Sequence, residues 1–185
     1  MLAPRPESND TWRMDDALFQ TLQHACLTLL PVAVWSVITS LLTPALILAA
    51  TAIHRRRSIP WRLLVTALVA GLLAESISSH LLKPIFAIAR PCLTAGLSEL
   101  ALCSWTYSMP SSHACSLAAG LAILWPANRR LTPIYAPLAL FYLLSRTALG
   151  MHRPSELVAG VLCGMVVGAA VKWAAGKIEQ RLSTC

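Results

Sequence analysis

Long runs of apolar residues, separated by short polar segments, dominate the chain. Five runs are long and apolar enough to be membrane helices, because crossing a hydrocarbon core of ~30 Å takes about 20 helical residues. They cover residues 31–53, 63–82, 111–127, 131–150 and 155–175. The third run is short for a bilayer, which indicates that its outer end begins below the lipid surface. The pattern contains no internal repeat and no low-complexity tract.

The segment before the first run has a different periodicity. In MDDALFQTLQHACLTLL, residues 14–30, apolar residues recur at helical spacing and polar residues occupy the other faces. Asp15 and Asp16 stand at its start, where acids suit the positive end of a helix dipole. We expect an amphipathic helix in the membrane interface that leads into the first span. The predicted fold is therefore an all-α integral membrane bundle of about five transmembrane helices plus an N-terminal interfacial helix.

The composition supports a membrane protein with one domain. Of the 185 residues, 56% are hydrophobic and 12% are charged, whereas soluble domains have about 25% charged residues. The first dozen residues contain acids and prolines but no apolar core, so they do not have the pattern of a cleavable signal peptide. We divide the chain into a flexible N-terminal tail at 1–13, a membrane domain at 14–176 and a cytoplasmic C-terminal tail at 177–185.

The 15 Lys and Arg residues are divided unequally between the two sides that five spans define, with nine on one side and six on the other. The positive-inside rule places the nine in the cytoplasm and the N-terminus outside. The net charge of +7 therefore reflects membrane topology. The basic residues lie between apolar runs instead of in one block, unlike those of a nucleic-acid site. The cytoplasmic set is Arg55, Arg56, Arg57, Arg62, Arg129, Arg130, Lys172, Lys177 and Arg181.

The six cysteines show no metal-ligand spacing. Cys26, Cys115 and Cys163 lie in apolar runs, where cysteine usually serves as a small core residue. Cys92 and Cys103 flank one loop, and a disulfide between them requires that this loop face an oxidising compartment. The sequence leaves this pairing open.

Three polar segments stand at the span ends on the outer side. They are KPIFAIARP at 83–91, PSSH at 110–113 and SRTALGMH at 145–152, which Glu156 follows. All three face the same side in a five-span topology, so they can converge in space. Charges at these places are costly unless they are paired, solvated or used.

Each segment also has an ordinary structural explanation. Lys83 can snorkel from a helix end to the lipid headgroups. Ser111 or Ser112 can be the N-cap of the third span, and His152 can be an interfacial histidine. These explanations account for the residues singly, but they do not account for the fixed spacings of all three segments together.

The three segments resemble the signature of the type 2 phosphatidic acid phosphatase family, membrane lipid phosphatases related in their site to vanadium haloperoxidases. That signature runs Lys-x6-Arg-Pro, then Pro-Ser-Gly-His, then Ser-Arg-x5-His-x3-Asp. Here Ser112 stands where glycine is usual, and Glu156 stands where aspartate is usual. The resemblance covers roughly residues 15 to 175, and it implies a version that lacks the first of six spans. The matching residues are Lys83, Arg90, Pro91, Pro110, Ser111, His113, Ser145, Arg146 and His152.

The residue types suit the binding of phosphate. A phosphate monoester carries nearly two negative charges, and its transfer is helped mainly by positioning and charge stabilisation. Lys83, Arg90 and Arg146 supply three cations, and the arginine fork fits phosphate oxygens. Ser111 and the backbone N–H groups that open the third span add donors at a helix N-terminus. Ser112 keeps the backbone N–H of the usual glycine, so we include it among the phosphate-binding residues.

The histidines and Glu156 are the expected catalytic residues. His152, as a neutral imidazole, would attack phosphorus and form a phosphohistidine. Glu156 would accept a hydrogen bond from the other ring nitrogen and fix the tautomer. This contact requires that Pro154 open the fifth helix at its first position. His113 would donate a proton to the leaving oxygen, and water would then release phosphate from His152.

A metal site is the main alternative to this chemistry, because His80, His113, His152 and Glu156 could gather a cation. Three fixed positive residues in the same pocket oppose it electrostatically, so we predict no metal and no cofactor. Glu75 lies inside the second span. An acid there is either functional or a hydrogen-bonded packing residue, and its role is left open.

The expected function is a metal-independent phosphoric ester or diphosphate hydrolase that acts on a lipid at the outer face of a bacterial inner membrane. The MPSSH variant also resembles dolichyl-type diphosphatases, which favours a polyprenyl diphosphate such as an undecaprenyl carrier. Phosphatidic acid, phosphatidylglycerol phosphate and lipid A are alternative substrates. A lipid-to-lipid phosphotransferase and a non-catalytic lipid-binding or transport protein are alternative functions. The expected partners are the lipid substrate and membrane lipids, without nucleic acid or a partner protein.

Overall fold

The computed structural model describes residues 10–37, 60–94, 103, 106–127 and 129–183, and all regular elements in these ranges are helical. This confirms the predicted all-α class. The elements are α1 (Asp10–Leu29), α2 (Val32–Val37), α4 (Trp61–Ser76), the π-helix η2 (Ile77–Leu82), α5 (Lys83–Phe86), α6 (Pro91–Thr94), α7 (Ser112–Ala127), the 3-10 helix η3 (Arg129–Leu131), α8 (Thr132–Ala148) and α9 (Pro154–Ser183).

Two helical stretches among the described residues are long and apolar enough to cross a membrane. One is Trp61–Phe86, which joins α4, η2 and α5, and the other is α9. They correspond to the second and fifth predicted spans. α7, the predicted short third span, has 16 residues, and α8 has 17. The total of five spans stays a prediction, because most of the first predicted span, 31–53, lies outside the described residues.

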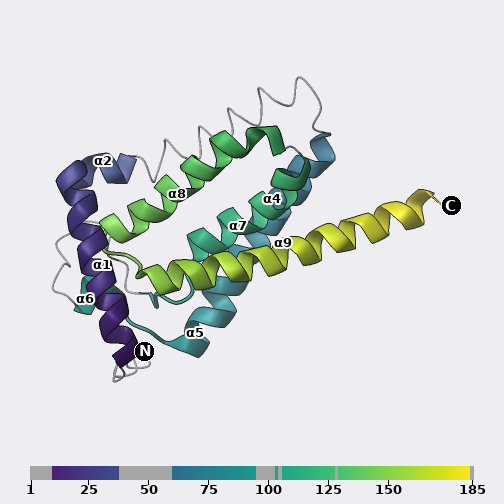
Figure 1. The fold of residues 1–185 in the computed structure, drawn as a ribbon. Coiled ribbons are helices and arrows are strands. Elements are labelled where there is room, and N and C mark those ends of the chain that lie inside the picture. Colours follow the sequence, from purple (N-terminus) through teal and green to yellow (C-terminus); the bar gives the residue numbers. More distant parts are fainter. Residues whose placement is uncertain (1–9, 38–59, 95–102, 104–105, 128, 184–185) are drawn as a thin grey trace.

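Close contact between α7 and α9 forms the centre of the bundle, with α4 packed against α7 (Figure 1). Gly160, Gly164 and Gly168 recur every four residues on one face of α9, where small residues let two membrane helices approach closely. A Cβ atom on Gly164 would lie 2.1 Å from the carbonyl oxygen of Cys115, and one on Gly160 or Gly168 would meet α7 at 2.6 Å. Successive glycines along α9 lie against successive positions along α7, so the two helices run parallel.

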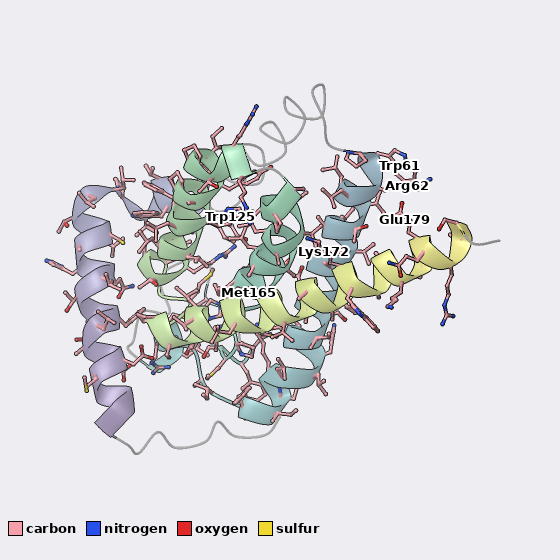
Figure 2. The ribbon with its side chains drawn as sticks, turned by 45° about the vertical axis from the view of Figure 1, so that its right-hand side comes forward. Trp61, Arg62, Trp125, Met165, Lys172 and Glu179 are labelled. Carbon is pink, nitrogen blue, oxygen red and sulfur yellow. A yellow bond between two sulfur atoms is a disulfide. The ribbon has the colours of Figure 1, made fainter. Side chains whose placement is uncertain are left out.

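The bundle has two ends of different chemistry. At one end the start of α4 meets the last turns of α9, where the Arg62 guanidinium lies 3.4 Å from the Glu179 carboxylate. Figure 2 shows Trp61, Arg62 and Glu179 gathered there. This end carries the described members of the basic set that the positive-inside rule assigned to the cytoplasm. At the opposite end α7 and α9 begin and α8 ends, and the polar segments of the sequence lie at that end.

α1 lies across the ends of α8 and α9 (Figure 1). It buries Phe19 and Cys26, and the side-chain amide of Gln23 donates a hydrogen bond to the Ala148 carbonyl (3.4 Å). α2 folds back on α1, because the Trp35 indole N–H donates to the Cys26 carbonyl (3.0 Å). The amphipathic helix predicted at 14–30 therefore exists. Its location in the membrane interface stays a prediction.

The helix ends differ from the predicted segment boundaries. α1 begins at Asp10, inside the segment assigned to the N-terminal tail, and α9 continues to Ser183, inside the segment assigned to the C-terminal tail. The division of the chain into two tails and a membrane domain stays a prediction.

Gly164→Ala tests the contact between α7 and α9. We expect it to lower the unfolding temperature in detergent, because the new methyl group overlaps the α7 backbone and overpacking of this kind costs about 1–3 kcal/mol or more. The matched control is Gly176→Ala, since a Cβ atom there meets nothing within 4 Å. Equal unfolding temperatures for the two variants would contradict the close contact.

Candidate active site

A tight turn between α8 and α9 places Arg146 and His152 close together. Gly150, with φ 71°, reverses the chain at the end of α8. The Gly150 N–H donates to the Thr147 carbonyl (2.9 Å), and the Met151 N–H donates to the Arg146 carbonyl (3.0 Å). This is the Schellman arrangement, in which a left-handed residue ends a helix and satisfies its last carbonyls. Arg146 thus lies in the last turn of α8, and His152 follows the turn directly.

His152 and Glu156 form a buried pair. Nδ1 of His152 lies 3.0 Å from Oε2 of Glu156, and the two side chains are 1% and 0% exposed. α9 begins at Pro154, as the sequence required for this four-residue offset. An ionised carboxylate can only accept hydrogen bonds, so with Glu156 ionised the proton of the ring lies on Nδ1 and the lone pair on Nε2. The longer side chain of glutamate therefore reaches the histidine.

Three further groups hold Glu156. The Ser108 hydroxyl donates to Oε1 (2.7 Å), the Arg153 backbone N–H donates to Oε2 (3.1 Å), and Nη1 of Arg153 donates to Oε1 (3.3 Å). The backbone carbonyl of Glu156 accepts from the Ser111 N–H (3.1 Å), which joins the start of α9 to the start of α7. Because both oxygens of the carboxylate are bound, its orientation toward His152 is fixed.

Arg90 and Arg146 are buried arginines at this end, each 6% exposed. Nε and Nη2 of Arg90 donate to the carbonyl and the hydroxyl of Thr106 (3.1 and 2.8 Å). Nη2 of Arg146 donates to the Tyr142 hydroxyl (3.0 Å). Among the buried polar side-chain atoms that the structure describes, Nε of Arg146 has no hydrogen-bond partner. A buried donor without a partner is costly, so this N–H is suited to an anionic ligand.

Lys83 follows directly after the π-helix η2 and is 7% exposed. π-Helical turns inside longer helices are frequent at functional sites. The Ser112 hydroxyl lies within hydrogen-bond distance of the hydroxyls of Ser78 (3.3 Å) and Ser79 (3.0 Å). The hydroxyl that this chain has in place of the usual glycine therefore ties the start of α7 to η2.

Ser111 is the N-cap of α7. Its hydroxyl accepts a hydrogen bond from the Ala114 N–H, at 3.5 Å. The N–H groups of the first helical turn have no acceptor inside the helix, and those of Ser112 and His113 belong to this turn. Ser111 therefore caps the start of α7, which is the ordinary structural role considered for it from the sequence.

The predicted site residues lie within electrostatic range of one another. His113 interacts with Arg146, His152, Lys83 and Arg90. His152 interacts with the same three cations. A histidine of α7 and a histidine of the turn before α9 thus share one positively charged environment, at the end of the bundle where α7 and α9 begin.

Burial lowers the pKa of His152 well below its ordinary value of 6.5, and Arg90, Lys83 and Arg146 lower it further. A hydrogen bond with the Ser108 backbone acts in the opposite direction. Burial likewise lowers the pKa of Arg90, but an arginine stays protonated because its ordinary pKa is so high. At neutral pH the site therefore combines a neutral imidazole with fixed positive charge.

The four residues named as alternative metal ligands, His80, His113, His152 and Glu156, do not form a metal-binding group in the described part of the chain. His80 and Glu75 are exposed, unlike His152 and Glu156. In the described part of the chain, no three His, Cys, Asp or Glu side chains gather as a metal ion would require. That the protein needs no metal stays a prediction.

A disulfide joins Cys92 to Cys103, with Cα atoms 6.0 Å apart. Cys92 is fully buried, and its backbone N–H donates to the Gly150 carbonyl (3.0 Å). The bond left open by the sequence is thus present, and it lies next to the turn that carries His152.

The comparison with known families decides the class of this site. The model of the PAP2 superfamily matches residues 60–179, a range that includes all the predicted site residues. The chain belongs to the PAP2 superfamily. The family resemblance proposed from the three sequence segments is therefore confirmed.

The fold of this PAP2 chain is similar to a solved structure, "the first transmembrane PAP2 type phosphatidylglycerolphosphate phosphatase from Bacillus subtilis". The two chains share 20% identity with a TM-score of 0.57, and the match covers 93% of this chain and 89% of the other. This likeness supports the helical membrane fold. A search of curated protein sequences gives no match.

Sequence reasoning missed four contacts of this PAP2 site. Ser108 was not considered, because no pattern in the loop before Pro110 marks it. Arg153 was counted only as a basic residue of the outer face. Asp15 and Asp16 were interpreted as partners of the α1 dipole, which is wrong because α1 begins at Asp10. Their side chains instead contact Ser155 and Arg153.

Replacing both Cys92 and Cys103 by serine tests the disulfide. We expect a lower unfolding temperature, because an 11-residue separation corresponds to about 3 kcal/mol or less of chain entropy. Cys163→Ala, which replaces a half-buried free thiol by a smaller apolar side chain, should change the unfolding temperature less than the double replacement. The disulfide is refuted if mass spectrometry of protein prepared under oxidising conditions finds six free thiols.

Proposed function

We propose that this protein hydrolyses a lipid phosphate or diphosphate through a phosphohistidine at His152. The coarser statement, a membrane lipid phosphatase, follows from membership in the PAP2 superfamily. The observation that supports the histidine mechanism best is the buried contact between Nδ1 of His152 and Glu156, beside three buried cations. It combines an oriented nucleophile with the charge that phosphate binding requires.

In the first step, the cations Lys83, Arg90 and Arg146 bind the phosphate oxygens, together with the N–H groups that open α7. Nε2 of His152 attacks the terminal phosphorus, and the bond between this phosphorus and the leaving oxygen breaks. The leaving group is the lipid alcohol of a monophosphate or the lipid monophosphate of a diphosphate. The negative charge of the phosphate favours the protonated form of His113, which gives its proton to the leaving oxygen. Glu156 stabilises the positive charge that develops on His152.

In the second step, water attacks the phosphohistidine. Neutral His113 accepts a proton from the water, the bond between phosphorus and Nε2 breaks, and inorganic phosphate leaves. Both histidines return to their starting forms, so the cycle needs no other reactant.

We propose a polyprenyl diphosphate as the substrate, on the basis of the MPSSH segment. The likeness to a phosphatidylglycerolphosphate phosphatase from Bacillus subtilis makes phosphatidylglycerol phosphate the second candidate. Both are anionic headgroups on long lipid tails, and both suit a site at the end of a membrane bundle.

We place the site at the outer face of a bacterial inner membrane. Two observations support this orientation. The described basic residues assigned to the cytoplasm lie at the opposite end of the bundle, as the positive-inside rule requires. The disulfide lies beside the site, and disulfides persist in oxidising compartments.

Phosphate release from a panel of purified lipids tests the function. The panel comprises undecaprenyl diphosphate, phosphatidylglycerol phosphate, phosphatidic acid and lipid A, each given alone to the protein in detergent. We expect release from at least one lipid without an acceptor lipid, inhibition by orthovanadate, insensitivity to chelators and nearly complete loss in His152→Ala. Release that needs a second lipid indicates a phosphotransferase, and full activity in His152→Ala contradicts the mechanism.

The pH dependence of kcat/KM tests the electrostatics around His152. Protonation of His152 removes the lone pair that attacks phosphorus. Because the pKa of His152 lies well below 6.5, its neutral form persists when the pH falls well below that value. Arg90→Gln removes one cation that lowers this pKa, so the acid limb should move to higher pH with the same lipid. The lipid titrates in the same way with both proteins. If the acid limb of kcat/KM lies at the same pH in Arg90→Gln and the wild type, Arg90 does not lower the pKa of His152.

A further inference from the structure

Arg153 is a buried charge next to the proposed nucleophile. Its side chain is 1% exposed, and its guanidinium contacts groups from α1, from α9 and from the segment before α6. Nε donates to Oδ1 of Asp16 in α1, and Nη1 donates to Oε1 of Glu156 and to the Ala89 carbonyl (3.3 Å each). A buried guanidinium is tolerated when it is paired, and here two carboxylates from distant parts of the chain share it.

Asp15 contacts the same helix start. The Ser155 backbone N–H donates to Oδ1 of Asp15 (3.2 Å), and the Ser155 hydroxyl donates to its Oδ2. Ser155 is the second residue of α9, so its N–H has no acceptor inside that helix. Asp15 and Asp16 of α1 thus bind Ser155 and Arg153, which both lie between His152 and Glu156. About 140 residues separate the two acids from these partners in the sequence.

We propose that Asp15 and Asp16 are positioning residues for the His152–Glu156 pair, with Asp16 acting through Arg153. The proposal rests on the proposed function. Arg153 is drawn by Asp16 on one side and by Glu156 on the other. If the Asp16 charge is removed, the attraction between the guanidinium and Glu156 is less opposed, and the guanidinium draws Oε1 toward itself. The carboxylate then turns away from Nδ1 of His152.

The identity of residue 156 makes such support necessary. Glutamate has one more rotatable bond than the aspartate usual in the family signature, so more contacts are needed to hold its carboxylate in one orientation. Ser108 and Arg153 supply these contacts, and Asp16 in turn fixes Arg153. α1 therefore completes the site.

The position of α1 does not depend on Asp16 alone. Phe19 and Cys26 are buried, and Gln23 donates a hydrogen bond to Ala148. A variant that removes only the Asp16 charge should therefore leave α1 in place. This separates positioning from folding in an experiment.

The test compares Asp16→Asn, Asp16→Glu and Glu179→Gln in the full chain, on the lipid of the panel that the wild type hydrolyses fastest. Glu179 is the matched control, since it loses the same charge from an exposed ion pair at the other end of the bundle. Active sites are counted by the stoichiometry of orthovanadate binding, measured by calorimetry. kcat is expressed per active site.

We expect Asp16→Asn to lower kcat about tenfold or more, because small misplacements of reacting groups are costly. KM and the number of vanadate sites should stay near the wild-type values. Asp16→Glu should restore most of the lost kcat, and Glu179→Gln should behave as the wild type.

Three results would overturn the proposal. The first is unchanged kcat in Asp16→Asn. The second is a loss that appears only as fewer vanadate sites and is the same in Asp16→Glu, since α1 would then only support folding. In both of these the wild type is active, so the proposed function stands. The third is a wild type that releases phosphate from no lipid, which overturns the proposed function together with this inference.

Discussion

Glu156 has no exposed surface, yet its carboxylate contacts His152, Ser108 and Arg153 at once. In a protein with so few charged residues, an ionised group of this kind is costly unless each of its oxygens is bound. The contacts that offset this cost also determine the geometry of the site. With Glu156 ionised, they favour the tautomer of His152 that carries its proton on Nδ1, and they connect Arg153 with an acid of α1.

The packing of the bundle places Glu156 beside the start of α7, where we propose that phosphate binds. Glycines on one face of α9 let it approach the α7 backbone, and at the end of that contact the Ser111 N–H meets the Glu156 carbonyl. The start of α7, which carries His113, thus lies beside the start of α9, which carries Glu156. The tight turn at Gly150 brings Arg146 to the same place. The site is a consequence of how three helix ends meet, and each end is fixed by its own local hydrogen bonds.

Much of the candidate site could be predicted from the sequence, because its residues occur in a fixed order along the chain. Lys83, Arg90, His113, Arg146 and His152 were named from their spacing, and α1 was predicted from its amphipathic pattern. The spacing of Gly160, Gly164 and Gly168 is equally readable, although it was not used. Ser108 could not be predicted, because its role depends on how a loop without periodicity returns to α9. The partners of Asp15 and Asp16 lie about 140 residues away, beyond any local pattern.

In the proposed mechanism, buried cations bind the phosphate so that Nε2 of a histidine, oriented by Glu156, can attack phosphorus. The most direct measurement is an experimental structure of the protein with orthovanadate bound. The account predicts vanadium bonded to Nε2 of His152, with Lys83, Arg90 and Arg146 on the vanadate oxygens and Nδ1 still on Glu156. Vanadate bound away from His152, or a His152 ring turned so that Nδ1 faces the anion, would contradict it.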